Sequence, residues 1–201
     1  MNANLKMKAV AAMVAGSALF SGSAMAMSGT DTATPFSVAN NVNFSIVIPG
    51  FLYFRVGVDS AVANTLTFTV PALNVGNATP VAATGGEAGP SALNVAARAN
   101  NGLVTIATTV AAATGMGTGT AADGFINYNQ ISTTSSDVPN FPAPALANAA
   151  IPNTTVALGG GPVGAGKVTN RVAVWTYSYL NTTIPSAGTY SGTVTYTATT
   201  P

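Results

Sequence analysis

The sequence predicts an all-β protein, a two-sheet β-sandwich that follows a cleaved signal peptide. Three observations lead to this prediction. The chain begins with the three-part pattern of an export signal. Many later segments alternate apolar and polar side chains with the period of two that is typical of a strand with one buried face. Turn-forming residues separate these segments and no amphipathic helical pattern lies between them, which favours two packed sheets.

The first 26 residues match a secretory signal peptide. Lys6 and Lys8 form a basic start, residues 9–20 are apolar, and residues 24–26 (A-M-A) supply the small side chains that a signal peptidase accepts. A membrane anchor is the alternative, but the apolar stretch is well short of the roughly 20 residues that cross a bilayer. We therefore expect cleavage after residue 26 and export to the bacterial cell surface, the extracellular space or the periplasm.

The mature chain is expected to be one weakly charged domain of 175 residues, since removal of residues 1–26 leaves that part of the 201. Its four basic and five acidic side chains give a net charge of −1 without any basic patch, which argues against nucleic-acid binding. No second long apolar run follows, so we expect no helical membrane span after signal cleavage. Cysteine is absent, so packing and strand pairing must supply the stability.

The mature chain divides into an N-terminal extension, residues 27–41, and a sandwich domain, residues 42–201. The first expected strand of the sandwich is Val42–Ile48, whose apolar side chains alternate with mostly polar ones. Pro49-Gly50 follows it as a turn signal. This segment is therefore predicted to bury one face in the core.

Further strands are predicted in the centre of the chain. They lie at residues 51–54, 65–70, 94–98, 103–106, 125–131 and 153–158. Asn101-Gly102 favours the primed turn of a β-hairpin, so the strands on either side of it are expected to pair. Residues 111–124 and 139–152 are rich in small residues, Gly or Pro, and are expected to be loops.

The C-terminal region has the clearest strand patterns. Trp175, Tyr177 and Tyr179 fall on one face of an expected strand, a turn follows at residues 181–188, and residues 190–199 alternate strictly. The three aromatic side chains could serve as a ligand platform that stacks on sugar rings. We favour the interpretation that they form the apolar face of a core strand.

The residue types that enzymes use are largely missing. Histidine and cysteine are absent, which excludes Ser-His-Asp and Cys-His nucleophiles and ordinary zinc sites. Gly161–Lys167 matches a phosphate-binding loop, but Val168 stands where Ser or Thr must hold magnesium. The acidic residues are scattered, so neither a glycosidase pair nor a calcium loop is indicated. We expect no catalysis, no cofactor and no metal.

A C-terminal pattern resembles that of known surface proteins. Pro185, Gly188 and Tyr190 form P-x-x-G-x-Y, and Val194 and Tyr196 belong to the alternating strand that follows. The pattern resembles the C-terminus of secreted Ig-like bacterial proteins, among them chaperone–usher pilins, spore coat protein U-like domains and WxL-type surface domains. The resemblance implies an Ig-like sandwich. For the pilins it implies an incomplete sandwich that receives a strand from a neighbouring subunit.

Under that resemblance residues 27–41 are the candidate donor, because Phe36 and Val38 have strand spacing. An ordinary flexible N-terminus is the alternative. The leading hypothesis is a non-catalytic structural subunit, pilin-like or part of an extracellular matrix, that self-associates through its strand edges. The implied partners are copies of the chain, a periplasmic chaperone and an outer-membrane usher. The second hypothesis is a monomeric surface adhesin or carbohydrate-binding module.

Overall fold

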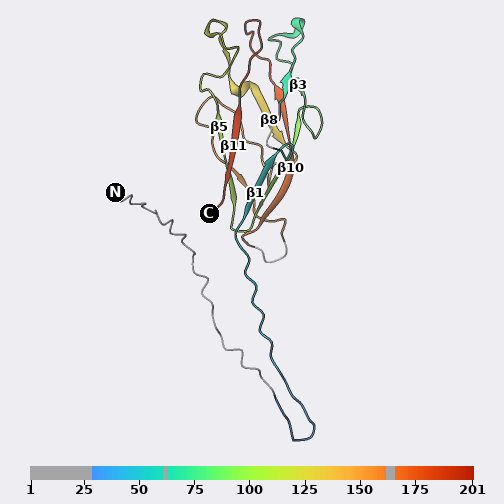
Figure 1. The fold of residues 1–201 in the computed structure, drawn as a ribbon. Coiled ribbons are helices and arrows are strands. Elements are labelled where there is room, and N and C mark those ends of the chain that lie inside the picture. The colour runs from blue at the N-terminus through green and yellow to red at the C-terminus, as the bar shows by residue number, and fades with distance from the viewer. Residues whose placement is uncertain (1–28, 61–62, 162–165) are drawn as a thin grey trace, which may run out of the picture. The chain divides into compact units, whose positions relative to one another are not determined.

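The computed structural model describes residues 29–60, 63–161 and 166–201 (Figure 1). The predicted signal peptide, residues 1–26, lies outside these ranges. The chain divides into two units, Met1–Val47 and Ile48–Pro201, and the second holds all the strands found in the described ranges. The second unit is all-β with short 3-10 turns, which confirms the predicted fold class.

The described residues of the second unit form strands joined by loops and short 3-10 turns. The strands are β1 (Leu52–Val56), β2 (Thr67–Phe68), β3 (Val81–Thr84), β4 (Ala92–Ala99), β5 (Val104–Val110), β6 (Met116–Gly117), β7 (Phe125–Ile126), β8 (Ile131–Ser135), β9 (Thr154–Val156), β10 (Thr169–Tyr179) and β11 (Val194–Thr199). The 3-10 turns are η1 (Ala72–Asn74), η2 (Ala121–Asp123) and η3 (Tyr128–Gln130).

Two antiparallel sheets make up the sandwich. The larger has the order β1-β4-β10-β3-β2, with β8 also paired to β10, and the smaller has the order β11-β5-β9. A short β6–β7 pair stands apart from both. The longest pairing joins β4 to β10, from Ala99 opposite Thr169 to Ala92 opposite Thr176. These two strands form the centre of the larger sheet.

The core lies between the two sheets and is centred on Trp175. Alternate residues of β10 point inward, so Trp175, Tyr177 and Tyr179 are all buried, as strand periodicity requires. The indole ring of Trp175 meets Phe141 and Tyr196 edge to face, with ring centroids 5.6 and 5.3 Å away. Since β10 and β11 belong to different sheets, this aromatic cluster fastens one sheet to the other.

The hairpin expected at Asn101-Gly102 is not formed. β4 pairs with β1 and β10 in the larger sheet, whereas β5 pairs with β11 and β9 in the smaller one. A type I′ turn needs positive φ at both central residues, but of the two only Gly102 has it. The Gly102 amide instead donates to the carbonyl of Lys167, 2.8 Å away. The Asn100–Gly102 turn therefore carries the chain from one sheet to the other.

The strand expected at Val42–Ile48 is not part of either sheet. Residues 36–51 are assigned to no helix, strand or turn, and the sandwich begins at β1 rather than at residue 42. Alternation shows that a segment can bury one apolar face, but not which surface will cover that face. The prediction of a core strand at Val42–Ile48 was wrong because the pattern was taken to mean burial within the same sandwich.

Other boundaries differ in smaller ways. β2 and β9 are shorter than the predicted strands, and the predicted strand at residues 125–131 is divided into β7, η3 and the start of β8. β11 begins at Val194 rather than near Tyr190, because residues 190–193 pass over the β6 region, where Ser191 pairs with Gly117. The expected loop at residues 139–152 contains no strand or helix.

Candidate functional site

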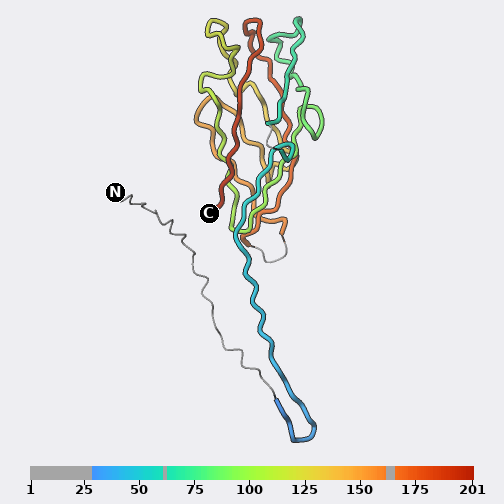
Figure 2. Tube along the Cα trace, viewed as in Figure 1, coloured from blue at the N-terminus to red at the C-terminus, as the bar shows by residue number. Residues whose placement is uncertain are grey.

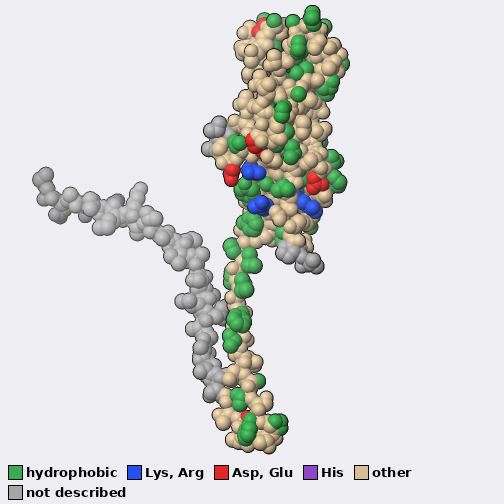
Figure 3. Space-filling view, turned by 90° about the vertical axis from the view of Figure 1, so that its right-hand side faces the viewer, with side chains coloured by type: hydrophobic (Ala, Val, Ile, Leu, Met, Phe, Trp, Pro, Cys, Tyr) green, Lys and Arg blue, Asp and Glu red, His purple; other side chains and the backbone are tan. Residues whose placement is uncertain are grey.

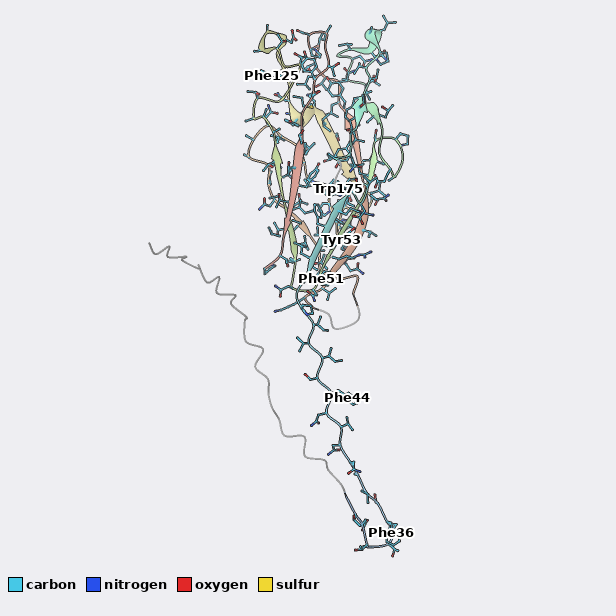
Figure 4. The ribbon with its side chains drawn as sticks, viewed as in Figure 1. Phe36, Phe44, Phe51, Tyr53, Phe125 and Trp175 are labelled. Carbon is cyan, nitrogen blue, oxygen red and sulfur yellow. The ribbon has the colours of Figure 1, made fainter. Side chains whose placement is uncertain are left out.

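The most unusual feature of the chain is a run of exposed apolar side chains at Val42–Ile48, here called the apolar segment. The alternating residues Val42, Phe44, Ile46 and Ile48 are 73, 88, 84 and 75% exposed (Figure 4). Hydrophobic side chains follow this stretch of chain in the space-filling view (Figure 3). A contiguous apolar surface of this kind is typical of a surface that binds a partner.

The apolar segment has the chemistry of an unpaired strand. It carries no charged residue, and its other side presents Asn43, Ser45 and Val47. No regular structure is assigned to its described backbone, so its amide and carbonyl groups belong to no sheet. Such a segment can gain both main-chain hydrogen bonds and apolar burial by adding to a sheet edge.

One such edge is offered by β11. Along one side it pairs with β5, from Val194 opposite Val110 to Thr199 opposite Thr105, and no described strand pairs with its other side. Its inward side chains Val194, Tyr196 and Ala198 are only half-buried. β5 has a neighbour on each side, and three of its inward residues, Val104, Ile106 and Thr108, are buried. The core is therefore incompletely covered beside β11.

A second edge is offered by β1, in the other sheet. It pairs only with β4 among the strands described, and its inward residues Phe54 and Val56 are half-buried. Their partners on β4, Ala97 and Val95, are essentially inaccessible to solvent. The core is thus uncovered along β1 in the same way as along β11.

These two edges lie on the same side of the sandwich. The Asn100 side chain bonds to Pro49 and Phe51 at the start of β1, and the Asn101 side-chain amide donates to the carbonyl of Pro201 just beyond β11. The start of β1 and the end of β11 therefore meet at one turn, where Figure 2 also places the C-terminus. We call the incompletely covered strip of core between them the β1–β11 opening.

The opposite side of the sandwich is closed by polar contacts. The Arg171 guanidinium on β10 donates to the carbonyl of Leu158 at 2.6 Å, and the Gly159 amide donates to Val168 at 2.8 Å. These bonds tie the chain after β9 to β10, across the two sheets. No strand pairing joins β1 to β11 among the described residues.

The predicted donor residues lie in the first unit, outside any strand. Phe36 and Val38 are 68 and 49% exposed, and between them the Ser37 amide donates to the Asp31 carboxylate at 2.8 Å. The Ala33 amide donates to the same carboxylate, and these bonds lower the pKa of Asp31. The carboxylate thus organises a local turn, and the longer run of alternating apolar residues lies further along, at the apolar segment.

The proposed ligand platform is buried. Trp175 is completely inaccessible, and Tyr177 and Tyr179 lie in the same core. The Tyr177 and Tyr196 hydroxyls are 3.3 Å apart and hydrogen-bonded, and burial raises the pKa of both. None of the three residues of β10 offers a ring face on which a sugar could stack.

The C-terminal motif has a structural role. The Tyr190 hydroxyl lies 3.0 Å from the carbonyl oxygens of Ser186 and Asp123, either of which can accept its hydrogen bond. The bond to Ser186 spans four residues and closes the loop just before the final strand. A Cβ added to Gly188 would lie 2.8 Å from Thr118. The motif, which begins at Pro185, thus fixes the path from β10 to β11.

Two acidic residues of the sandwich, Asp123 and Asp137, stabilise turns. Asp123 accepts a hydrogen bond from the Thr118 hydroxyl at 2.6 Å, and Asp137 accepts one from the Asn140 amide at 2.8 Å. In the part of the chain that the structure describes, no three metal-ligating side chains gather, and no helix is long and apolar enough to cross a membrane. The middle of the Gly161–Lys167 loop, residues 162–165, lies outside the described ranges.

Comparisons with protein-family models, with curated proteins and with solved structures found no match for this chain. Functional interpretation therefore depends on the apolar segment and the β1–β11 opening.

Proposed function

We propose that this protein is an exported, non-catalytic structural subunit that self-associates by strand donation. The apolar segment of one copy pairs with the free edge of β11 in another and covers the β1–β11 opening there. The single observation that carries the proposal is the coexistence of an exposed segment of alternating apolar residues with half-buried apolar residues along two unpaired edges. The segment lacks a strand to pair with, and the two edges lack a strand that would cover the core.

Dimensions and chemistry support this pairing. The seven residues of the apolar segment match the six-residue length of β11, so one segment can satisfy that whole edge. Its four alternating apolar side chains would enter the opening, and burial of such side chains contributes about 1.5–3 kcal/mol each. Part of that gain offsets the cost of ordering the segment and of association. The polar side of the segment would remain in water.

The direction of the donated strand decides the kind of assembly. Ile48 joins the start of β1, at the Asn100–Gly102 end of its own sandwich. A donor that runs antiparallel to β11 places its own sandwich beyond the opposite end of the acceptor, which gives a head-to-tail contact and an open chain. A donor that runs parallel brings two like ends together and favours a closed pair. We propose the antiparallel arrangement, since antiparallel pairing is the more stable per residue.

Export and the partners of assembly belong to the same proposal. The N-terminal pattern Met1–Ala26 supports passage through a secretory route. A subunit with an exposed apolar segment and an incompletely covered core is prone to aggregation before assembly. A periplasmic chaperone and an outer-membrane usher, as the resemblance to pilins implies, would protect it and direct it to the cell surface. The buried Trp175 leaves the carbohydrate-binding alternative without its platform.

The test is assembly of the purified mature chain, residues 27–201, followed by light scattering, negative-stain microscopy and an unboiled gel. We expect filaments or an SDS-resistant ladder. The variant Phe44→Asp with Ile46→Asp should be monomeric, because it places two charges on the apolar side of the segment. The control, Asn43→Asp with Ser45→Asp, adds the same charge to the other side and should still assemble.

Two results would refute the proposal. One is a mature chain that stays monomeric at all concentrations tested. The other is assembly of the Phe44→Asp, Ile46→Asp variant to the same extent as the unaltered chain, which would place the contact elsewhere.

A further inference from the structure

Two arginines stand close together on the outer face of the larger sheet. Tyr53 and Arg55 alternate with the inward residues of β1, and Arg98 on β4 lies opposite Tyr53, so these three side chains face away from the core. Arg55 lies opposite Ala96, two residues before Arg98, which makes the two arginines diagonal neighbours. Backbones at diagonal positions are roughly 7–8 Å apart. Both guanidinium groups can therefore reach the same ligand.

Neither arginine has an acidic partner. In the described part of the chain no ion pair or hydrogen bond involves the guanidinium of Arg55 or Arg98, and the Nε of Arg55 is buried without an acceptor. The Cζ of Arg98 lies over the ring of Tyr53, 5.9 Å from its centroid. The carboxylate of Glu87, in the loop before β4, accepts instead from the Asn94 amide at 2.7 Å. The two positive charges repel each other, and an anion bound by both would remove that repulsion.

Protection of a sheet edge explains only one of the two arginines. β1 is an edge strand of the larger sheet, and a charged side chain on such a strand discourages uncontrolled pairing, which explains Arg55. Arg98 stands on β4, which has a neighbour on each side and no edge to protect. The mature chain has four basic residues in all. The placement of two of them side by side therefore needs another explanation.

The surface beside the arginines is partly apolar. Ala96 lies between Arg55 on β1 and Val172 on β10, in one row across the three strands. Ala96 is buried, whereas Val172 is largely exposed and Tyr53 on β1 is half-buried (Figure 4). A guanidinium group binds a planar carboxylate through two parallel hydrogen bonds. A sugar ring has an apolar face of C–H groups that can pack on Val and Tyr side chains. A sugar acid combines the two kinds of group that this surface can bind.

We propose that the outer face of β1, β4 and β10 binds an acidic polysaccharide. Arg55 and Arg98 hold its carboxylates, and Tyr53 and Val172 pack against its sugar rings; these four residues are here called the arginine face. The site goes beyond the proposed function and is distinct from the buried aromatic residues of β10. It lies on the side of the sheet away from the core, so a strand donated to the β1–β11 opening leaves it uncovered.

Other anionic partners fit the arginine face less well. Anionic membranes attract clusters of about four to eight basic residues, and this face has two. A nucleic acid is bound by neutralising several phosphates, for which a mature chain of net charge −1 is poorly suited. A carboxylated sugar needs only the two guanidinium groups and an apolar surface beside them.

The test measures binding of an oligomer of galacturonic acid to the mature chain at physiological ionic strength. The chain carries Phe44→Asp and Ile46→Asp, so that assembly does not alter the signal. Arg55→Gln and Arg98→Gln should each weaken binding about tenfold, the effect of one charge-assisted hydrogen bond. Lys167→Gln is the matched control: it removes one charge from an exposed residue before β10 and should leave binding nearly unchanged.

Two further comparisons separate carboxylate recognition from general charge attraction. Arg55→Lys and Arg98→Lys keep the charge and lose the guanidinium fork, so their affinities should lie between those of the unaltered arginines and the glutamine variants. The methyl-esterified oligomer has the same sugars without the charge and should not bind. The emission of Trp175 shows whether each variant is folded. Should Arg55→Gln fail to fold, the exposed Arg98 still provides the test.

Several results would overturn the inference. One is binding of the oligomer that is equal in the presence and absence of both arginines, and another is a loss in Lys167→Gln as large as in Arg98→Gln. Equal binding of the acid and its methyl ester would show that the carboxylates are not recognised. Preferential binding to vesicles of phosphatidylglycerol would assign the arginine face to a membrane instead. None of these results bears on strand donation, which is tested by assembly.

Discussion

The indole ring of Trp175 on β10 meets the phenol ring of Tyr196 on β11 edge to face, with centroids 5.3 Å apart and planes inclined by 61°. Trp175 is buried completely, whereas Tyr196 is half-buried beside the β1–β11 opening. One ring pair therefore connects the centre of the core to its incompletely covered margin. Changes at the opening should therefore alter the surroundings of Trp175 and be detectable in its fluorescence.

Trp175 gives a direct spectroscopic test, because it is the only tryptophan of the chain. We expect blue-shifted emission that acrylamide quenches poorly in the folded monomer, and a red shift on unfolding. The Phe44→Asp, Ile46→Asp variant should retain the blue shift, since its substitutions lie outside the sandwich. Red-shifted, readily quenched emission from this folded variant would contradict the burial of Trp175.

Substitution of Tyr196 should separate ring packing from hydrogen bonding. Tyr196→Ala removes the contact with Trp175, and we expect a loss of about 2–4 kcal/mol in the free energy of unfolding. Tyr196→Phe keeps the ring and loses the bond to the Tyr177 hydroxyl, which should cost about 1 kcal/mol. Urea unfolding in the Phe44→Asp, Ile46→Asp background measures both values without interference from assembly. Equal losses would show that the ring contact contributes little.

The sandwich should lose stability in alkaline solution. Burial raises the pKa of Tyr177 and Tyr196 above the ordinary value of about 10, so the folded state retains protons that the unfolded state releases. Below about pH 10 these two tyrosines are protonated in both states, so they should not make stability depend on pH. As the pH rises further, the free energy of unfolding should fall. Unfolding followed between pH 8 and 11.5 tests this, with Tyr177→Phe as the variant in which the decline should be shallower. A decline of the same slope in Tyr177→Phe would assign it to other groups.

Gly192 should tolerate no side chain. An added Cβ would lie 2.3 Å from the Tyr128 hydroxyl oxygen and 2.6 Å from Met116, and Tyr128 is buried. We expect Gly192→Ala to cost about 1–3 kcal/mol in the free energy of unfolding, as overpacking does. Gly166→Ala is the control, because its Cβ would meet nothing within 4 Å. A Gly192→Ala variant as stable as the control would show that the loop before β11 moves aside easily.

The sequence predicted strands best where other parts of the same chain cover the apolar face of the strand. The alternation at Ala173–Tyr179 predicted both β10 and its inward aromatic face, because periodicity reports the side of a strand that needs cover. The same reasoning at Val42–Ile48 predicted a core strand, and the structure has exposed chain instead. Nothing in a local pattern says whether the covering surface lies in the same molecule.

Two further features depend on contacts distant in sequence. Asn101-Gly102 has the composition of a hairpin turn, yet its geometry is set by Lys167 and Pro201, which are about 65 and 100 residues away. The β1–β11 opening depends on sheet order, which leaves the first and last of the described strands, β1 and β11, each without a partner on one side. Neither the turn nor the opening could be read from neighbouring residues.

A peptide with the sequence of residues 40–50 should bind the β1–β11 opening from solution. The acceptor for this test is the full mature chain with Phe44→Asp and Ile46→Asp, whose own segment is the weaker ligand. A ligand that binds only the folded state stabilises that state by mass action. The melting temperature of the acceptor chain should therefore rise with peptide concentration. A peptide carrying the same two aspartates should leave the melting temperature unchanged. Broadening of the Tyr196 ring signals by the first peptide alone would place the contact at the opening. Equal effects of both peptides would contradict strand donation.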